Sequence, residues 1–418
     1  MGFRDRLEDL ERGGTPIRVG LVGVGQMGRG FIAQVGDVPG MEMVAAADLD
    51  LERTLGAFRE GGQDPIEGVD GRPGRPAVTQ DPLDLVRSAS VDVVVEATGI
   101  VEVGARVAYE AILHGKHVVM LNVETDVTVG AVLNRMAQSA EVVYTGSAGD
   151  EPGAIMELYD FARSLGFEVL VAGKGKNNPL DPSADPESIG EEARKKRMNP
   201  KMLASFVDGT KTMVEMGAVA NAAGLSPDVP GMHGPQETVP DRLVDVFGLR
   251  EEGGVLSRYG VVDYVRGVAP GVFVIVRSPE GPVRETLEYL GQGAGPNHIL
   301  YRPFHLTSIE TPISVARAVI YGEPTIACGP APTSEVVAVA KRDLAVGDEL
   351  GSIGSADYYG WLYTASEARD MLPLGLASGA RITRDVARGQ PVPRSAVELA
   401  RGSFVASLRR LQEASREG

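Results

Sequence analysis

The chain has 418 residues, of which 43% are hydrophobic and 23% are charged, so it is long enough for two or three globular domains and too apolar for wholesale disorder. Its formal charge of −16 argues against non-specific binding to nucleic acid, and no nucleic-acid partner is expected. No apolar run reaches the roughly 20 residues that span a bilayer, so no membrane partner is expected either.

The N-terminus and the single cysteine bear on the cellular location. The first residues, MGFRDRLEDLERGG, are charged and helix-like and contain no apolar core segment, so they are not a secretory signal. With Cys328 alone, no internal disulfide can form, which suits a reducing compartment. A cytoplasmic location is expected.

Strand-like and helix-like segments alternate through the first third of the chain. Residues 17–25 read IRVGLVGVG, an apolar β-branched run that ends in glycines and predicts a buried strand entering a tight turn. Strands alternating with helices predict a parallel sheet with right-handed crossovers, and residues 1–148 are expected to form a doubly wound Rossmann domain. The further strands are predicted at 41–50, 91–99, 117–122 and 141–148, and the helices at 29–38, 105–116 and 127–140.

The rest of the chain predicts an α/β protein with two further domains. A helix at 151–166 and a strand at 167–173 come first, followed by charged helical sequence from 181 to 224 and short β runs up to residue 330. Residues 149–330 are expected to form an α+β catalytic, substrate-binding and dimerisation domain. Short strands and turns then predict a small β-rich domain at 331–418.

The motif GVGQMG carries the clearest functional signal. Gly23, Gly25 and Gly28 match G-x-G-x-x-G, in which the glycines form the turn, admit pyrophosphate to the backbone and let the helix pack on the strand. The motif follows a strand and opens a helix, and Asp48 ends the next strand about twenty residues on. A dinucleotide site is therefore predicted.

Asp48 also bears on which dinucleotide binds. A carboxylate at this place hydrogen-bonds the ribose 2′-hydroxyl of NAD and repels the 2′-phosphate of NADP, whereas Arg53 is near enough to compensate for that phosphate. The sequence leaves NAD and NADP open. The other predicted cofactor residues lie in the helix turn or at the carboxyl ends of strands: Gln26, Met27, Ala97, Thr98, Gly99, Asn122 and Glu124, with Asp126 beside them.

The stretch GKGKNNP at 173–179 gathers cations in an acidic protein. Lys174 and Lys176 point to the same side if the preceding strand continues. Asn177 and Asn178 can donate amide hydrogens, so the stretch is a candidate anion site. The alternative interpretation is a solvated polar turn.

Further ionisable residues follow in the helical region. Asp208, Lys211 and Glu215 are spaced i, i+3 and i+7 and are expected on one face of a helix at 208–224. Glu191 and Lys195 form an i, i+4 pair that is either a surface ion pair or an acid–lysine pair at a carbonyl. Weaker candidates for substrate binding are His233, Arg302 and His305.

These residues carry a resemblance to a known family. The stretches GVGQMG, EATG, GKGKNNP, FVDGTKTMVEM, GMHGP and YRPFHL resemble homoserine-dehydrogenase-like oxidoreductases with a C-terminal SAF domain, in their deoxyxylulose-phosphate-reductoisomerase-like branch. The resemblance covers nearly the whole chain, and KRDLAVGDEL in the tail is similar to the SAF β-clip. It implies conversion of 1-deoxyxylulose 5-phosphate to 2-C-methylerythritol 4-phosphate with NADPH, in isoprenoid precursor synthesis.

On that basis, roles follow for the candidate residues. Lys174 and Lys176, with Asn177 and Asn178, would bind the phosphate or adjacent hydroxyls. Lys211 would polarise or protonate the carbonyl oxygen, with Asp208 orienting it. Mg²⁺ or Mn²⁺ would be held by Asp150 and Glu151.

Other functions remain open from the sequence. One is simple dehydrogenation of homoserine, another hydroxy acid or a sugar phosphate, and another keeps the isomerase–reductase chemistry on a different carbon skeleton. A third is a non-catalytic NAD(P)-binding regulator, which would have no need of the ionisable residues between 174 and 215. A homodimer is the expected assembly.

Overall fold

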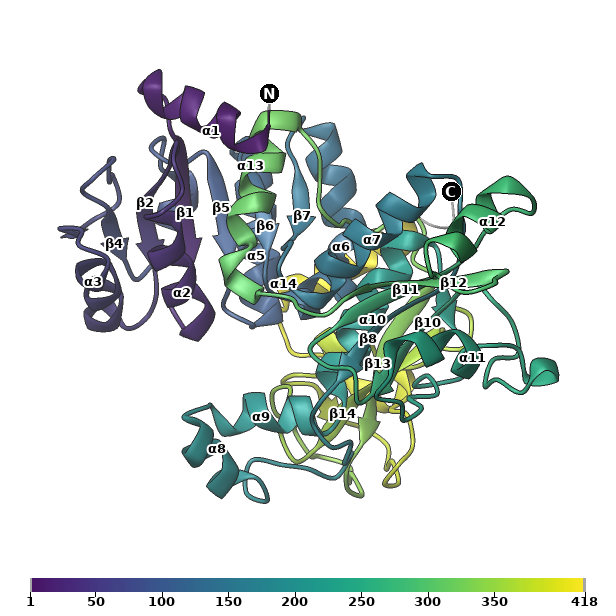
Figure 1. The fold of residues 1–418 in the computed structure, drawn as a ribbon. Coiled ribbons are helices and arrows are strands. Elements are labelled where there is room, and N and C mark those ends of the chain that lie inside the picture. Colours follow the sequence, from purple (N-terminus) through teal and green to yellow (C-terminus); the bar gives the residue numbers. More distant parts are fainter. Residues whose placement is uncertain (1, 416–418) are drawn as a thin grey trace. The chain divides into compact units, whose positions relative to one another are not determined.

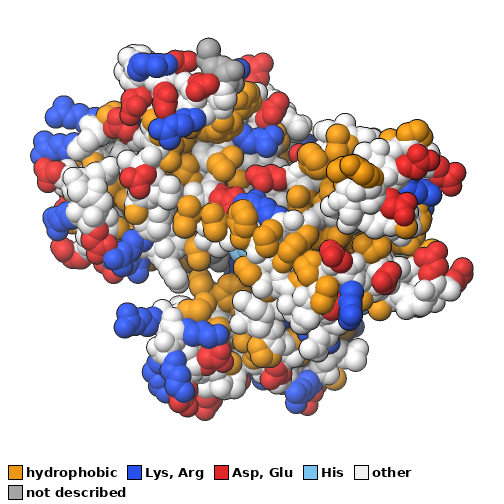
Figure 2. Space-filling model, viewed as in Figure 1, with side chains coloured by type: hydrophobic (Ala, Val, Ile, Leu, Met, Phe, Trp, Pro, Cys, Tyr) orange, Lys and Arg blue, Asp and Glu red, His pale blue; other side chains and the backbone are white. Residues whose placement is uncertain are grey.

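The computed structural model describes residues 2–415, and contacts between backbone positions divide them into two compact units. The first contains the chain up to Gly153, Leu306–Pro330 and the stretch from Ser407 onward, and the second contains Ala154–His305 and Ala331–Ala406. The sequence suggested boundaries at 148 and 330, whereas the units alternate along the chain (Figure 1). On the face drawn in Figure 2, acidic and basic side chains are mixed.

The first unit contains the expected parallel sheet. Its seven strands lie in the order β3-β4-β2-β1-β5-β6-β7, and all neighbouring pairs are parallel. The strand order reverses at β1 and β5, and in such sheets ligands bind beyond the carboxyl ends of the strands at this point. The strands are β1 Ile17–Val22, β2 Met41–Ala47, β3 Ile66–Glu67, β4 Ala77–Thr79, β5 Val93–Glu96, β6 His117–Met120 and β7 Tyr144–Gly146.

Helices connect and cover these strands. Right-handed crossovers place α2 and α3 on one face of the sheet and α4, α5 and α6 on the other. The returning helix α13 packs beside α2, and α14 at the carboxyl end is bonded to α6. The helices are α1 Phe3–Arg12, α2 Gln26–Val35, α3 Leu51–Glu60, α4 Pro82–Arg87, α5 Val101–Leu113, α6 Val123–Ser139, η3 Thr307–Ile309, α13 Thr311–Tyr321 and α14 Phe404–Ala414.

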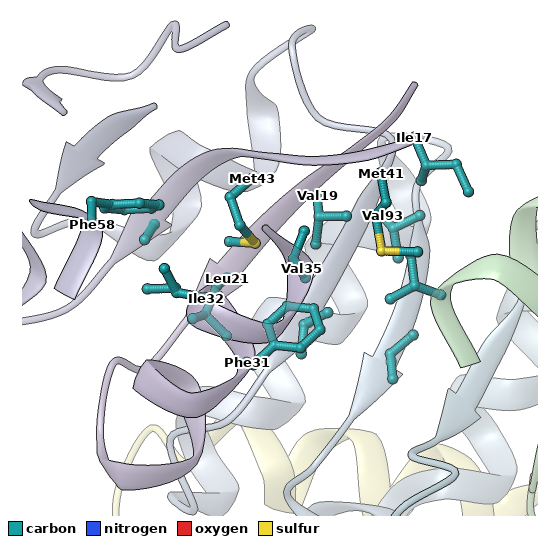
Figure 3. Packing of buried hydrophobic residues seen from close by; sticks show 14 of the residues in the cluster. Ile17, Val19, Leu21, Phe31, Ile32, Val35, Met41, Met43, Phe58 and Val93 are labelled. Carbon is teal, nitrogen blue, oxygen red and sulfur yellow. The ribbon is translucent and has the colours of Figure 1, made fainter. Parts of the chain in front are cut away.

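A hydrophobic core fixes α2 against the sheet. Phe31, Ile32 and Val35 of α2 contact side chains of β1 and β2, including Leu21 and Met43, and all five are at most 2% exposed (Figure 3). Burial of each such side chain stabilises the fold by about 1.5–3 kcal/mol. This core holds the start of α2, and with it the glycine turn, at the carboxyl edge of β1.

The second unit is built on a five-stranded mixed sheet in the order β12-β11-β8-β10-β9. Its central strand, β8, extends to Lys176, so the strand predicted at 167–173 is longer than expected. The reason is pairing on both sides, because Lys174 stands opposite Tyr264 of β10 and Val272 of β11. The strands are β8 Glu168–Lys176, β9 Ser226–Pro227, β10 Val261–Arg266, β11 Val272–Arg277 and β12 Asn297–Arg302.

Helix α10 contacts both β8 and β10, and the antiparallel pair β13–β14 in turn contacts α10. Within the described part of the chain, no helix has both the length and the hydropathy needed to cross a membrane. The helices of this unit are α7 Glu151–Ser164 (whose first residues belong to the first unit), α8 Gly190–Lys196, α9 Pro200–Val207, α10 Thr210–Ala223, η1 Pro240–Arg242, α11 Leu243–Val246, η2 Arg250–Glu252, α12 Pro282–Tyr289, η4 Leu374–Leu376 and η5 Arg394–Ala396. The remaining strands are β13 Ser334–Ala340, β14 Tyr358–Thr364, β15 Arg381–Ile382 and β16 Val397–Glu398.

Candidate functional site

The glycine turn between β1 and α2 has the geometry of a phosphate-binding turn. Gly23 has a φ of +94°, and a Cβ atom there would lie 2.8 Å from the backbone of Ala97 and Thr98. A Cβ atom on Gly28 would lie 2.2 Å from the carbonyl oxygen of Gly23. At Gly25, by contrast, nothing in the described structure lies within 4 Å of such an atom, so a ligand can approach the backbone. Two glycines shape the turn, and the third leaves it open.

The start of α2 suits an anion. Gly25 is the N-cap, and no side chain caps the helix. The first N–H groups of α2 therefore remain available for the pyrophosphate of a dinucleotide. The predicted residues Gln26 and Met27 form this exposed first turn. The turn fits a dinucleotide.

Asp48 lies directly after β2 and has two roles in this arrangement. Its carboxylate accepts hydrogen bonds from the backbone N–H of Val24 (2.7 Å) and Asp50 (2.9 Å), so it holds the glycine turn. The Arg53 guanidinium donates to it at 2.6 Å, from a side chain that is half exposed. The carboxylate lies at the carboxyl end of β2, and its contact with a ribose stays a prediction.

The segment after β5 lies at the carboxyl edge of the sheet, as do the glycine turn after β1 and Asp48 after β2. Glu96, the last residue of β5, is fully buried, and its carboxylate accepts hydrogen bonds from the backbone N–H (2.9 Å) and the hydroxyl of Thr98. Burial raises the pKa of Glu96 to about 7, against the effect of these hydrogen bonds. Ala97, Thr98 and Gly99 were among the residues predicted from the sequence, whereas Glu96 was not, although it is a carboxylate at the end of a run of valines.

Asn122, Glu124 and Asp126, which the sequence placed near the cofactor, follow β6 and are buried, unlike residues that line an open site. Asn122 is 1% exposed and caps α6, with its side-chain oxygen accepting from Thr125 N–H at 3.2 Å. Glu124 and Asp126 are buried in the first turn of α6. Burial raises the pKa of Asp126 to about 6.

In the second unit, Lys174 and Lys176 lie on the same face of β8, and each is 5% exposed. The Lys174 ammonium is paired with the buried carboxylate of Glu215 in α10. The Lys176 ammonium donates to the carbonyl oxygen of Phe206 at 2.7 Å. The two lysines do share a side, but they are buried in a strand and do not form a solvated turn.

The environment of Lys176 favours proton transfer near neutral pH. Burial, and after it the charge of Lys174, lowers its pKa to about 8, whereas Glu215 and Asp208 oppose the shift. A lysine with such a pKa is a competent general acid and base under physiological conditions. Lys176 shares this face of β8 with the buried ion pair of Lys174 and Glu215, so three ionisable side chains are buried in this part of the second unit.

Asp208 does not share the helix face that its spacing suggested. It lies at the end of α9, before α10 begins, and accepts from Thr210 N–H at 2.8 Å. Its carboxylate pairs with the buried ammonium of Lys341 at 2.8 Å, whereas the prediction from the sequence was that it orients Lys211. Gly209 separates the two helices with a φ of +93°, which breaks the helical spacing assumed from the sequence. Lys211 itself is half-buried on α10.

The histidine of GMHGP is held between two acidic residues. His233 Nδ1 lies 2.8 Å from an oxygen of Asp263, and Nε2 lies 3.4 Å from one of Asp228. The Asp263 carboxylate also accepts the backbone N–H groups of His233 and Gly234, so it fixes this loop. The assignment of His233 to substrate binding stays a prediction.

Two of the remaining candidates, Lys195 and Arg302, form ion pairs. Lys195 is exposed and paired with Glu191 at 2.8 Å, as in the surface alternative. Arg302 pairs with Glu157 at 3.0 Å and lies over the ring of Phe304. The functional roles of Lys195 and Arg302 stay predictions, as do those of the other candidates: His305 and Asn178 (half-buried), Asn177 (exposed), and Asp150 and Glu151 (half-buried, at the start of α7).

Two family models match the chain. Residues 23–144 match "Homoserine dehydrogenase, NAD binding domain", and residues 149–311 match "Oxidoreductase DRL, catalytic domain". Neither match extends past residue 311, so the SAF resemblance of the tail remains a prediction. No curated protein matches the chain.

Several solved structures are similar to the chain at low sequence identity. A probable dehydrogenase from Thermotoga maritima is 13% identical, with 74% of this chain and 90% of that chain covered and a TM-score of 0.45. A myo-inositol dehydrogenase from Corynebacterium glutamicum is 11% identical, with coverages of 73% and 89% and a TM-score of 0.43. A scyllo-inositol dehydrogenase from Lactobacillus casei is 15% identical, with coverages of 69% and 76% and a TM-score of 0.39.

The two family matches coincide with the features described above. The homoserine-dehydrogenase-type match covers the glycine turn, Asp48 and the segment after β5, and the DRL match covers the buried lysines of β8. The chain is an NAD-binding oxidoreductase of the Rossmann type, with a homoserine-dehydrogenase-type NAD-binding domain followed by a DRL-type catalytic domain.

Proposed function

We propose that the protein interconverts an alcohol and a carbonyl compound with NAD(H), and that Lys176 transfers the proton. The observation that carries this proposal is the buried position of Lys176, on the face of β8 that also holds the ion pair of Lys174 and Glu215, where burial lowers its pKa to about 8. When bound, the nicotinamide supplies or accepts the hydride. The protein must then protonate the developing alkoxide or remove the hydroxyl proton, and Lys176 does so.

The neighbouring charges tune this proton transfer. Glu215 pairs with Lys174 and so offsets the charge closest to Lys176. The hydrogen bond to the carbonyl oxygen of Phe206 orients the Lys176 ammonium without neutralising it. Lys176 therefore keeps a proton that it can release.

We propose NAD(H) as the preferred cofactor. The Asp48 carboxylate is held by backbone N–H groups, so it keeps its place at the ribose edge. The nearby cation, Arg53, is already paired with Asp48. Both features disfavour a 2′-phosphate.

A second candidate is the reductoisomerase reaction on 1-deoxyxylulose 5-phosphate. It is supported by the motifs around GKGKNNP and GMHGP, and the Lys176 ammonium is a cation for a phosphorylated substrate. It also requires rearrangement of the carbon skeleton, for which the Mg²⁺ or Mn²⁺ site at Asp150 and Glu151 was predicted. The simple dehydrogenase needs no such step and is the better supported of the two.

One substrate screen separates these candidates. NADH and NADPH oxidation would be followed at 340 nm with aldehydes, keto acids, ketoses and deoxyxylulose phosphate, each with and without Mg²⁺, and NAD reduction with homoserine and polyols. We expect turnover with NADH on an unrearranged carbonyl substrate. Turnover confined to deoxyxylulose phosphate would favour the second candidate. Binding of cofactor without turnover on any substrate would favour a regulator.

A further inference from the structure

Glu96 is a buried carboxylate at the cofactor edge that the proposed chemistry does not use. It ends β5, beside Val22 of β1 and Met120 of β6, at the place where the strand order reverses. Its neighbours in β5 are valines that are fully buried. An apolar side chain would pack in the core at this position without the cost of burying a charge. The presence of a carboxylate therefore needs an explanation other than packing.

The hydrogen bonds of Glu96 shape the turn that follows it. The carboxylate accepts both the backbone N–H and the hydroxyl of Thr98, and the Asn122 amide further stabilises its ionised form. The turn so formed touches the glycine turn, because a Cβ atom on Gly23 would lie 2.8 Å from the backbone nitrogen of Thr98. In addition, Ala97 N–H donates to the carbonyl oxygen of Val22 at 2.8 Å.

Two carboxylates thus support the glycine turn from opposite sides. Asp48 holds it through Val24 N–H on the β2 side. Glu96 holds the Thr98 turn against it on the β5 side. The charge of Glu124 in α6 disfavours ionisation of Glu96, and the charge of Glu96 in turn contributes to raising the pKa of Tyr144 in β7.

We propose that Glu96 is a positioning residue for the dinucleotide, whose ionised carboxylate holds the Thr98 turn and the glycine turn in their binding shape. This inference rests on the proposed binding of NAD(H) at the glycine turn. A protonated Glu96 is a weaker acceptor for the two Thr98 hydrogen bonds, so the turn loosens. Cofactor affinity then falls as pH drops through the pKa of Glu96, which is about 7.

The test is NADH binding, measured by calorimetry on the full chain between pH 5.5 and 8.5. For the unaltered protein we expect binding about three- to tenfold weaker at pH 6 than at pH 8, with a midpoint near 7. Glu96→Gln keeps an acceptor for Thr98 but cannot ionise, so its affinity should show no step near pH 7. Glu42→Gln is the matched control, because Glu42 of β2 also has a pKa raised by burial but lies near the amino end of its strand, and it should keep the step.

A second variant keeps the inference testable if Glu96→Gln does not fold. Thr98→Val removes the largest hydrogen-bond contribution to the ionised form, so it should move the midpoint to higher pH. A step that is unchanged in both variants, or affinity that is independent of pH in the unaltered protein, would overturn the role of Glu96. Absence of NADH binding at every pH would instead overturn the proposed function.

Discussion

At the scale of single residues, Lys174 and Glu215 form a buried ion pair whose contribution to stability can be measured. Both side chains are almost fully buried, and such a pair is stabilising only while both partners are present. We expect Glu215→Gln to lower the free energy of unfolding by about 3 kcal/mol, because it leaves the Lys174 ammonium buried without its carboxylate. Urea denaturation would measure this change.

The matched control is Glu191→Gln, which removes an exposed carboxylate from an i, i+4 pair. That change should lower stability by less than about 1 kcal/mol. Adding Lys174→Met to Glu215→Gln should recover part of the loss. Equal effects of the buried and the exposed substitution would contradict the pairing of Lys174 with Glu215.

Substitution of Asp48 should change the preference of the protein for NAD over NADP. Asp48→Asn keeps an oxygen that can accept from Val24 N–H but loses the charge that repels a 2′-phosphate. We expect the preference for NAD over NADP, taken from the ratio of dissociation constants, to fall at least about tenfold, or about 1.4 kcal/mol. An unchanged preference would show that Asp48 does not contact the ribose.

Only some of these residues were predictable from the sequence. The glycine pattern fixed the turn, because its spacing reflects local backbone geometry. The shared side of Lys174 and Lys176 followed from strand periodicity. The partner of Asp208 did not, because Lys341 lies far along the chain and only tertiary structure brings the two together. Glu96 was missed because its role depends on contacts across three strands.

At the scale of elements, side chains of α14 stabilise α6 through hydrogen bonds. Gln412 of α14 donates to the carbonyl oxygen of Thr128 (3.3 Å) and accepts from Val132 N–H (3.0 Å), which are i, i+4 positions of α6. Arg409 donates to the same carbonyl oxygen at 3.1 Å. A side chain from another helix thus bonds into the hydrogen-bond ladder of α6.

We expect Gln412→Ala to lower the free energy of unfolding by about 1–3 kcal/mol, because buried groups of α6 lose their partner. Leu411→Ala is the control, since Leu411 is 52% exposed on the same helix, and a change within about 0.5 kcal/mol is expected there. Thermal or chemical denaturation distinguishes the two. A loss for Leu411→Ala as large as that for Gln412→Ala would contradict this role.

The periodic elements were largely predictable, and their boundaries less so. The β-branched runs in the sequence predicted the strands of the first sheet. The structure has these strands in a parallel sheet, which confirms the predicted doubly wound fold. The helix expected at 208–224 begins only at Thr210, because Gly209 adopts a left-handed conformation. The strand expected to end at 173 runs to Lys176, because both of its neighbours pair with it.

For the whole molecule, the chain returns to each unit after leaving it. Leu306–Pro330 and the stretch from Ser407 onward belong to the first unit, while Ala331–Ala406 belongs to the second. Each unit is therefore stabilised by residues that come late in the sequence. Lys341 pairs with Asp208 in the second unit, and Gln412 bonds to α6 in the first. No local sequence pattern reveals this alternation, since it depends on contacts between distant segments.

The central claim is that Lys176 transfers the proton in an NAD(H)-dependent reaction. In the direction of carbonyl reduction the lysine must be protonated, so kcat should fall as pH rises through about 8; in alcohol oxidation it should fall as pH drops through the same value.

The most direct measurement is the pH dependence of kcat for carbonyl reduction in the unaltered protein and in Lys176→Ala, with Lys196→Ala as an exposed-lysine control. The account predicts an alkaline limb near pH 8 in the unaltered protein and in the control, and at least about a hundredfold lower kcat without that limb in Lys176→Ala. The same limb and the same kcat in Lys176→Ala would contradict it.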